Sequence, residues 1–243
     1  MNQEKDQLFA QPLKQLVDFQ FDDKVAKVFP DMIKRSVPGY ATIINLIGIL
    51  AQQYAQPNSI CYDLGCSLGA ATLSLAQNIT TDNCRIIAVD NSEAMVRQCK
   101  VNIERATNNV PINLVCSDLK DVKIENASMV ILNFTLQFIQ PANRLELLSK
   151  IAGGMLPGGL LVLSEKVRFE NSEQQALLTE LHHAFKKANG YSELEISQKR
   201  TALENVLIPE TIEIHKQRLN DAGFSQSLLW FQCFNFCSFV AIK

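Results

Sequence analysis

Three polar side chains follow separate apolar, strand-like runs of this sequence, and each could contact a polar ligand. They are Asp90, Asp118 and Asn133. An acid at the end of a strand can accept hydrogen bonds from both hydroxyl groups of a ribose, and we assign that role to Asp90. Because the carboxyl ends of parallel strands meet at one edge of a sheet, we expect the three side chains to surround one ligand. For Asp118 the alternative is a turn cap, and for Asn133 it is a simple strand end.

A tight turn of small residues lies between the buried run Ile60–Asp63 and a helix-compatible run from Ala70 to Gln77. Glycine lets the backbone approach a ligand, and we expect the N–H groups of this turn to point outward. Asp90 follows about 20 residues later, a spacing that favours a nucleoside with a polar tail over a turn that only reverses the chain. The turn residues predicted to contact the ligand are Gly65, Cys66 and Ser67.

The overall charge gives no sign of a nucleic-acid-binding protein. The chain has 243 residues, with 23 Lys and Arg against 25 Asp and Glu, so its formal charge is −2. A stand-alone nucleic-acid binder needs an excess of positive charge to neutralise phosphates. We therefore expect no direct contact with nucleic acid, although a local basic patch remains open.

Cysteine usage and hydropathy favour a cytoplasmic protein. The seven cysteines are scattered, odd in number and without a Cys-x-x-Cys pair, as expected for reduced thiols. No run approaches the ~20 apolar residues of a membrane span, and the polar N-terminal stretch contains no apolar signal segment. We predict neither secretion nor membrane insertion.

Strand-like and helix-like runs alternate along the chain, which predicts an α/β fold with a doubly wound, mostly parallel sheet. We expect one domain, residues 1–243, with N-terminal helices and a helical insertion over about 171–206 that is broken at Asn189-Gly190. The predicted strands are Ile60–Asp63, Arg85–Asp90, Ile112–Cys116, Met129–Phe134 and Leu160–Ser164, followed by an antiparallel pair, Leu228–Cys233 and Phe236–Ile242. Seven strands result.

Three local expectations concern the N-terminal residues and two of the helices. Residues 1 to about 20 are predicted to be loosely ordered, and a short helix capped near Asp22 is predicted to end at Phe29 because Pro30 interrupts it. A helix from about Ala142 to Ala152 is predicted to turn its apolar face inward, with Leu145, Leu148 and Ile151 on that face.

Five features occur in a fixed order along the chain and together resemble the class I S-adenosylmethionine-dependent methyltransferase fold. They are the turn, Asp90, Asp118, Asn133 and Leu156-Pro157-Gly158-Gly159 before the fifth strand. The resemblance implies that S-adenosyl-L-methionine is bound at this edge. It further implies that Asp118 binds the adenine amino group, that Leu119 donates a backbone N–H, and that Asn91 lies beside Asp90 in the site.

The turn has Ser67-Leu68 where many methyltransferases have a glycine. This difference points to one particular family within the fold. Nearly the whole chain resembles the carboxy-S-adenosyl-L-methionine synthase family. The stretches that carry the likeness include Val28 to Ile33, Arg35 to Tyr40, Tyr62 to Thr72, Asn126 to Val130, Asn133 to Phe138, Asn189 to Arg200 and Trp230 to Phe236.

Membership of that family implies a reaction of S-adenosyl-L-methionine with prephenate. The products are carboxy-S-adenosyl-L-methionine and phenylpyruvate, and the former supplies a partner enzyme that builds 5-carboxymethoxyuridine at the tRNA wobble position. The resemblance implies no metal, and we expect a homodimer from the helical insertion and the aromatic tail. Whether substrate or product accompanies the purified protein stays open.

Arg200 and Tyr40 are the residues to which the resemblance gives a part in the reaction. A carboxylated product and a dicarboxylate substrate require a cation, and the Arg200 guanidinium can bind a carboxylate through two hydrogen bonds. Arg200 could serve its own chain or a neighbour's, and on residue type alone a solvated surface arginine is the plainer interpretation. Tyr40 could lie against the ligand and hydrogen-bond a carboxylate, or serve only in packing.

Two other functions remain open from the residues alone. One is an ordinary methyltransferase of a small molecule or tRNA, and the other is a non-catalytic subunit that binds S-adenosylmethionine. His182 and His183 are adjacent on a predicted helix, so their rings diverge by about 100° and do not readily chelate one metal. We predict a surface or lid position for them.

Overall fold

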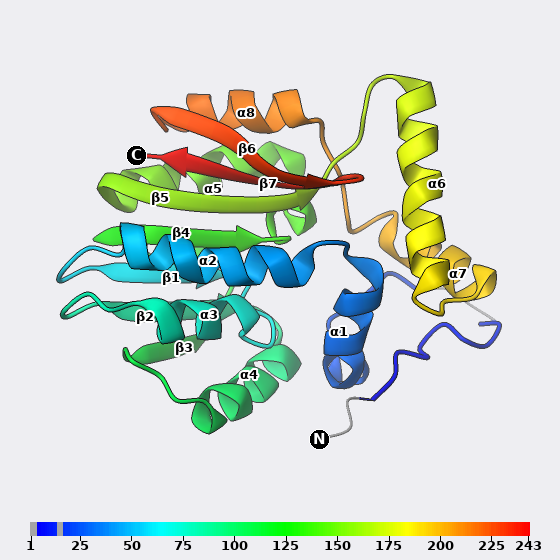
Figure 1. The fold of residues 1–243 in the computed structure, drawn as a ribbon, viewed down its shortest axis with the longest axis horizontal. Helices are drawn as coiled ribbons and strands as arrows, with labels where there is room; N and C mark the ends of the chain where they lie inside the picture. The colour runs from blue at the N-terminus through cyan, green and yellow to red at the C-terminus, as the bar shows by residue number, and fades with distance from the viewer. Residues whose placement is uncertain (1–3, 14–16) are drawn as a thin grey trace.

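A single seven-stranded sheet forms the centre of the fold (Figure 1). The computed structural model describes residues 4–13 and 17–243. The strand order is β3-β2-β1-β4-β5-β7-β6, with β1 to β5 parallel and β7 antiparallel to both of its neighbours. The strands are β1 (Ile60–Leu64), β2 (Arg85–Asp90), β3 (Ile112–Cys116), β4 (Ala127–Asn133), β5 (Met155–Lys166), β6 (Gln226–Cys233) and β7 (Phe236–Ile242). The predicted doubly wound sheet and its closing hairpin are confirmed.

Helices cover both faces of this sheet, so its central strands are apolar on both sides. In β4, Met129 packs with residues of α2 and α3 on one face, whereas Val130 packs with residues of α5 and α8 on the other. The helices are α1 (Asp23–Ser36), α2 (Tyr40–Tyr54), α3 (Ala70–Asn78), α4 (Glu93–Arg105), α5 (Pro141–Gly154), α6 (Ser172–Ala188), α7 (Glu193–Leu203) and α8 (Ile212–Asp221).

Helix α1 does not end at Phe29, so that prediction is wrong. The helix continues through Pro30 to Ser36. Proline in a helix interior costs about 3 kcal/mol. The burial of Val28 on one side of Pro30 and of Met32 on the other, in one cluster with α4, offsets that cost. The predicted N-terminal cap is confirmed, since the Asp22 carboxylate accepts the backbone N–H groups of Lys24 and Val25 in the first turn of the helix.

The segment before α1 is more closely attached than predicted. Asp6 is only 1% exposed, and its backbone N–H donates to Asp31 Oδ2 at 2.8 Å. Phe19 donates its backbone N–H to the carbonyl of Ala202, a residue of α7, at 2.9 Å. The described part of residues 1–20 is therefore ordered by long-range contacts that no local pattern encodes, while residues 1–3 and 14–16 lie outside the described part of the chain.

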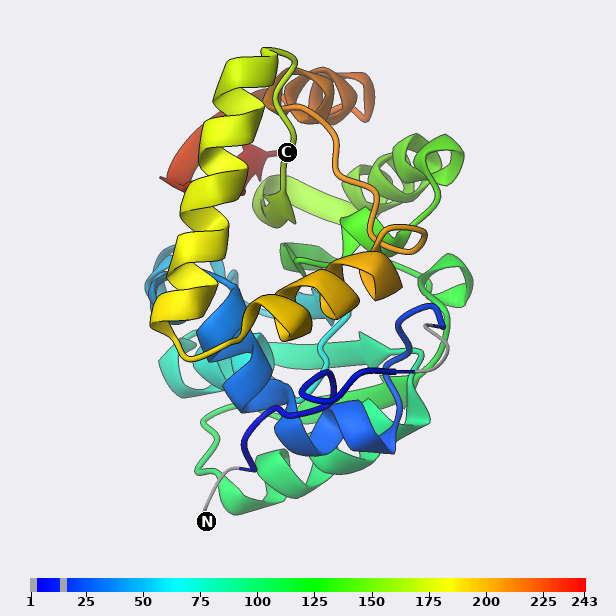
Figure 2. The ribbon, with the colours of Figure 1, turned by 90° about the vertical axis from the view of Figure 1, so that its right-hand side faces the viewer.

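The predicted helical insertion consists of α6 and α7, which meet at Asn189-Gly190 as expected. Figure 2 looks onto the carboxyl ends of the strands and shows both helices crossing in front of that edge, next to α1. Helix α7 begins with a capping box, in which Ser192 and Glu195 each satisfy a backbone N–H of the other. The insertion thus lies over the edge where strand-end side chains converge.

On α5 the predicted inward face is partly wrong. Leu148 and Ile151 are fully buried, but Leu145 is 42% exposed. Arg144 takes the inward place at this end of the helix, where its Nε donates to the Ile139 carbonyl at 2.8 Å and its guanidinium pairs with Glu210. Arg144 is charged, so the pattern of apolar residues does not predict that it is buried. The pattern predicts the neighbouring Leu145 to face inward instead.

Candidate functional site

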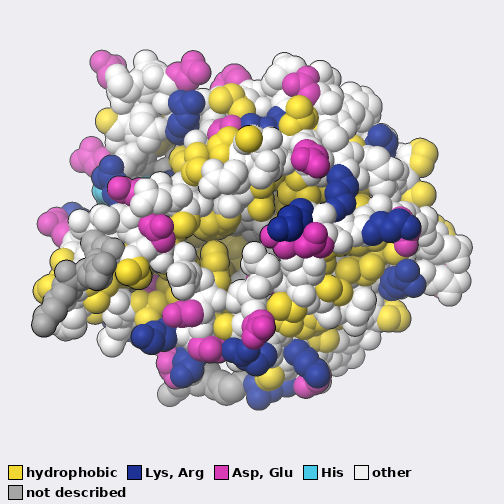
Figure 3. All heavy atoms as spheres, turned by 180° about the vertical axis from the view of Figure 1, so that it is seen from behind, with side chains coloured by type: hydrophobic (Ala, Val, Ile, Leu, Met, Phe, Trp, Pro, Cys, Tyr) yellow, Lys and Arg dark blue, Asp and Glu magenta, His cyan; other side chains and the backbone are white. Residues whose placement is uncertain are grey.

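A cavity lies between the carboxyl ends of β1, β2, β4 and β5 and the helices α1, α2, α6 and α7. Its volume is about 270 Å³, which fits a small organic ligand. Figure 3 shows the molecule from behind, with a hollow near the centre of this face whose floor is hydrophobic and with Lys and Arg interspersed with Asp and Glu around it. Nine of the ten predicted site residues line the cavity: Tyr40, Gly65, Cys66, Ser67, Asp90, Asn91, Asp118, Leu119 and Asn133.

The turn after β1 approaches the cavity because Gly65 leaves room for its neighbours. Gly65 has a φ of +86°, and a Cβ at this position would come within 2.3 Å of Thr135 Oγ1. The outward direction predicted for the N–H groups of the turn is wrong for three of them. Gly65 and Cys66 donate to the Val89 carbonyl at 2.8 and 2.9 Å, and Ser67 donates to Asp90 Oδ2 at 2.9 Å. These bonds fix the turn to β2.

We name the cavity wall formed by Asp63, Asp90, Asp118 and Asn133 the acidic end. Asp90 accepts one backbone N–H on each carboxylate oxygen, from Ser67 and, at 2.9 Å, from Ser92. Burial nevertheless raises its pKa. Asp63 is 1% exposed, and burial raises its pKa to about 6 although the Thr72 hydroxyl donates to it at 2.5 Å. Carboxylates held in this way favour hydroxyl and ammonium donors of a ligand.

Asn133 presents a buried polar atom to the cavity. Its Oδ1 has no hydrogen-bond partner among the described residues. Buried acceptors are nearly always paired in folded proteins, so an unpaired one aimed into a cavity is a position for a donor of the ligand. Asp118 differs, because its Oδ1 accepts the backbone N–H of Lys120 at 3.0 Å and its side chain is 46% exposed.

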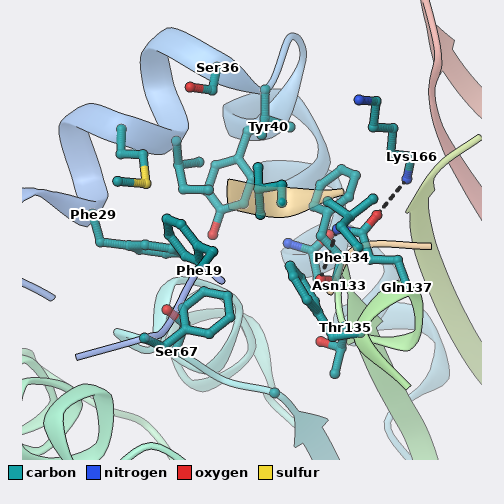
Figure 4. A pocket seen from close by; sticks show the side chains of 18 of the residues that line it. Phe19, Phe29, Ser36, Tyr40, Ser67, Asn133, Phe134, Thr135, Gln137 and Lys166 are labelled. Carbon is teal, nitrogen blue, oxygen red and sulfur yellow. Dashed lines mark hydrogen bonds between the residues drawn. The ribbon is translucent and has the colours of Figure 1, made fainter. Parts of the chain in front are cut away.

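Tyr40 stands at the start of α2 and stacks on Phe134, with the ring centroids 6.2 Å apart. Burial raises the pKa of Tyr40, and Asp63 raises it further, so its hydroxyl stays protonated and can donate. Figure 4 shows this hydroxyl directed toward the side of the cavity where Phe19 and Ser67 lie. Tyr40 is therefore both a packing residue and a lining residue.

Aromatic side chains form much of the remaining wall, and sequence analysis missed them. Phe19, Phe21 and Phe138 line the cavity, and their rings meet edge to face at centroid distances of 5.2 Å (Phe19 to Phe21) and 5.3 Å (Phe21 to Phe138). Phe19 belongs to the segment predicted to be loosely ordered. This apolar wall limits the water around a bound ligand.

Another part of the cavity wall carries positive charge, and we name it the lysine end. Lys166 at the end of β5, Lys186 in α6 and Lys199 in α7 all line the cavity. None was predicted, although the position of Lys166 at the carboxyl end of a strand is a signal that could have found it. Arg200, which was predicted, is exposed and does not line the cavity of its own chain.

His182 also lines the cavity, so the predicted surface position is wrong for it, while α6, which carries it, lies over the edge where the strands end. His182 is 4% exposed, its Nε2 lies 2.8 Å from the Ser36 carbonyl oxygen, and its ring contacts that of Phe236. Burial lowers its pKa to about 3, so the ring is neutral. Among the residues that the structure describes, no group of three His, Cys, Asp or Glu side chains is arranged to hold a metal ion.

Similarity to known proteins extends over the whole chain. It is 61% identical over 244 residues to the carboxy-S-adenosyl-L-methionine synthase of Trichlorobacter lovleyi and 60% identical over 243 residues to that of Shewanella piezotolerans, each match covering 100% of both chains. The family model described as a methyltransferase domain matches residues 61–159. The chain belongs to the carboxy-S-adenosyl-L-methionine synthase family. It is therefore an enzyme that uses S-adenosyl-L-methionine as a substrate and makes carboxy-S-adenosyl-L-methionine.

Solved structures agree on the fold. A putative S-adenosyl-L-methionine-dependent methyltransferase from Methanococcus maripaludis superposes with a TM-score of 0.59 at 20% identity, covering 96% of this chain and 97% of that one. A putative O-methyltransferase from Nostoc punctiforme gives a TM-score of 0.64 at 19% identity and covers 91% of this chain and 59% of its own. The predicted class I methyltransferase fold is confirmed. Family membership sets aside the alternatives of an ordinary methyltransferase and a non-catalytic subunit.

In the part of the chain that the structure describes, no helix is both long and apolar enough to cross a bilayer.

Proposed function

We propose that prephenate is the second substrate and that the reaction yields carboxy-S-adenosyl-L-methionine and phenylpyruvate. The observation that carries this proposal is the cavity with an acidic end and a lysine end. S-adenosyl-L-methionine offers hydroxyl and amino donors that suit the first, and a dicarboxylate suits the second. The name of the relatives specifies the product, carboxy-S-adenosyl-L-methionine. In this proposal, prephenate supplies the carboxyl group of that product.

The acidic end holds the nucleoside in this proposal. Asp90 accepts the ribose hydroxyls, Asp118 accepts the adenine amino group, and Leu119 donates its backbone N–H to the same ring. Asn133 and Asn91 complete the polar wall, and the backbone of Gly65, Cys66 and Ser67 lies against the ligand. All of these residues line the cavity.

The chemistry turns a methyl group that is normally an electrophile into a nucleophile. Prephenate loses its ring carboxylate as carbon dioxide and its ring hydroxyl as hydroxide, which makes the ring of phenylpyruvate aromatic. The hydroxide takes a proton from the sulfonium methyl and becomes water, and the resulting ylide carbon forms a bond to carbon dioxide. Proximity inside the cavity replaces a strong protein base, and the aromatic wall limits quenching by bulk water.

Tyr40 and Arg200 are the residues proposed to contact the carboxylate of the product. The Tyr40 hydroxyl remains protonated and faces the cavity, so it is suited to donate. Arg200 lies exposed on α7, next to the cavity-lining Lys199. It therefore acts either after a movement of α7 or in the cavity of a second copy of the chain, and a homodimer is part of this proposal.

The carboxylated product is proposed to serve a separate enzyme that builds 5-carboxymethoxyuridine at the tRNA wobble position. The chain itself has a formal charge of −2, and the face in Figure 3 mixes both signs of charge. Neither feature favours direct tRNA binding.

Mass spectrometry tests the proposed function. Purified protein is incubated with S-adenosyl-L-methionine, with and without prephenate. We expect a sulfonium species heavier by one carbon dioxide only when prephenate is present, together with phenylpyruvate in equal amount. Unchanged S-adenosyl-L-methionine in the presence of prephenate, or a carboxylated product formed equally well without it, contradicts the proposal.

A further inference from the structure

Three elements that are distant in the sequence bring ammonium groups to the lysine end. Lys166 ends β5, Lys186 lies near the end of α6 and Lys199 lies on α7. Figure 4 shows Lys166 extending from β5, with its backbone N–H bonded to Gln137 Oε1 at 2.9 Å. This bond fixes where the Lys166 side chain begins. A cluster of like charges in a half-closed cavity is unfavourable unless a counter-charge is bound there.

The three lysines differ in their partners. Lys199 Nζ lies 3.2 Å from Ser36 Oγ and 3.7 Å from Asp6 Oδ2, so the protein already neutralises it. Lys166 and Lys186 have no carboxylate within ion-pair distance and no acceptor for their ammonium groups among the residues described. These two positive groups are the ones left without a partner in the cavity wall.

The charged neighbours of these two lysines are mostly positive. Burial, together with the charges of Lys166, Lys199 and Arg200, lowers the pKa of Lys186 to about 7. Burial and then Arg200 also lower the pKa of Lys166. Asp6 is engaged by Lys199, and Asp90 belongs to the acidic end. A bound dianion would therefore stabilise the charged form of both lysines.

We propose that Lys186 and Lys166 bind the carboxylates of the second substrate and thereby select a dicarboxylate over a monocarboxylate. This inference rests on the proposed function, because it assigns residues to a dicarboxylic acid such as prephenate. Two ammonium groups on flexible side chains can each bind one carboxylate as a point charge and donate hydrogen bonds to it. Lys199 stays with Asp6 and orients α7.

Kinetics with variants that remove one charge at a time test the assignment. Lys186→Gln and Lys166→Gln are assayed for carboxylated product at saturating S-adenosyl-L-methionine and varied prephenate. Each is expected to raise the KM for prephenate by about tenfold or more, as the loss of a charge-assisted hydrogen bond does. The dissociation constant for S-adenosyl-L-methionine, measured by calorimetry, is expected to change by less than about twofold.

The chain offers a matched control next to Lys186. Lys187 is exposed and pairs with Glu193 at 2.6 Å, outside the cavity lining. Lys187→Gln is expected to keep the wild-type KM for prephenate. Lys186→Arg keeps the charge and is expected to recover part of the affinity that Lys186→Gln loses, which separates a charge effect from a folding defect.

The outcomes distinguish this inference from the function on which it rests. Unchanged KM values for prephenate in both glutamine variants, with an active wild-type enzyme, overturn the assignment of the lysines alone. An equal loss of affinity for S-adenosyl-L-methionine overturns it as well, because the lysines would then shape the whole cavity. A wild-type enzyme that forms no carboxylated product from prephenate overturns the proposed function and this inference together.

Discussion

The two ends of the cavity are built differently. The acidic end consists of side chains at the ends of β1, β2 and β4 and of Asp118 in the loop after β3, and the Asp90 carboxylate is fixed by two backbone N–H groups. The lysine end combines the end of β5 with two helices of the insertion, and its ammonium groups stand on long side chains. One part of the wall is thus rigid and strand-based, and the other is made largely of helices and flexible side chains.

This difference separates two tasks. The fold is shared with methyltransferases that are only 19% and 20% identical to this chain, whereas the full-length match is to carboxy-S-adenosyl-L-methionine synthases. We attribute the binding of the methyl donor, S-adenosyl-L-methionine, to the acidic end. We attribute the handling of a second, dianionic substrate to the lysine end, which the insertion completes.

The largest loss of activity is expected from changing Arg200. This variant tests whether the lysine end needs a further cation that lies outside the cavity of its own chain. Arg200→Ala is expected to abolish the carboxylated product because the carboxylate loses its guanidinium anchor. Binding of S-adenosyl-L-methionine, measured by calorimetry, is expected to remain nearly intact. Lys216, an exposed helix residue outside the cavity lining, provides a control as Lys216→Ala. Equal turnover by Arg200→Ala removes Arg200 from the site.

Mixing subunits shows which copy of the chain uses Arg200. At an S-adenosyl-L-methionine concentration near the wild-type dissociation constant, Arg200→Ala subunits are expected to be inactive alone and Asp90→Asn subunits nearly so. If Arg200 acts across a dimer, a mixed dimer contains one complete site and activity returns on mixing. If no activity returns after subunit exchange has been verified, Arg200 serves its own chain.

At the acidic end, Asp90→Asn is expected to weaken the binding of S-adenosyl-L-methionine by about 100-fold, the loss of charge-assisted bonds to the ribose and to the turn. Calorimetric titration measures this affinity. Asp82→Asn, at an exposed acid outside the cavity, serves as the control. If the affinity for S-adenosyl-L-methionine does not change, Asp90 does not bind the ribose, and the acidic end does not have the role that we assign to it.

Asp63 links the acidic end to the pH dependence of stability. Its pKa in the folded chain is raised to about 6, so its stabilising contribution is complete below pH ~4 and is lost as the pH rises through about 6. Relative to wild type, Asp63→Asn is therefore expected to gain about 2 kcal/mol of unfolding free energy between pH 4 and pH 7. Urea unfolding without S-adenosyl-L-methionine measures the gain, and a difference that does not change with pH contradicts it.

The smallest effect is expected in the helix that carries Lys199 and Arg200. Ser192→Ala removes the capping box of α7 and is expected to cost about 1 kcal/mol of unfolding free energy. Ser197→Ala, at an exposed position of the same helix, is the control for the loss of a hydroxyl. If thermal unfolding gives equal losses for both variants, the cap does not position the lysine end.

Two residues of the acidic end, Asp90 and Asn133, could be predicted from the sequence because each ends a short apolar strand. The order of the parallel strands then brings Asp90 and Asn133 to the same edge without any knowledge of side-chain contacts. The break at Asn189-Gly190 is an equally local signal, and it was predicted, whereas the Ser192 cap was not.

The lysine end could not be predicted in the same way, because its geometry depends on how the insertion packs. Lys199 and Arg200 are adjacent on α7, so their side chains diverge by about 100°, and only the packing of α7 on Ser36 and Asp6 decides which one lines the cavity. Likewise, the buried Asp6 depends on contacts with α1 and α7 that are distant in the sequence.

The central claim is that a carboxyl group passes from a dicarboxylate at the lysine end to the sulfonium methyl held from the acidic end. Its most direct test uses prephenate with an isotopic label in the ring carboxyl group and mass spectrometry of the sulfonium product. We predict that the product carries the label in full and that phenylpyruvate carries none. A carboxylated product without the label, or with the label diluted by dissolved bicarbonate, would contradict the account.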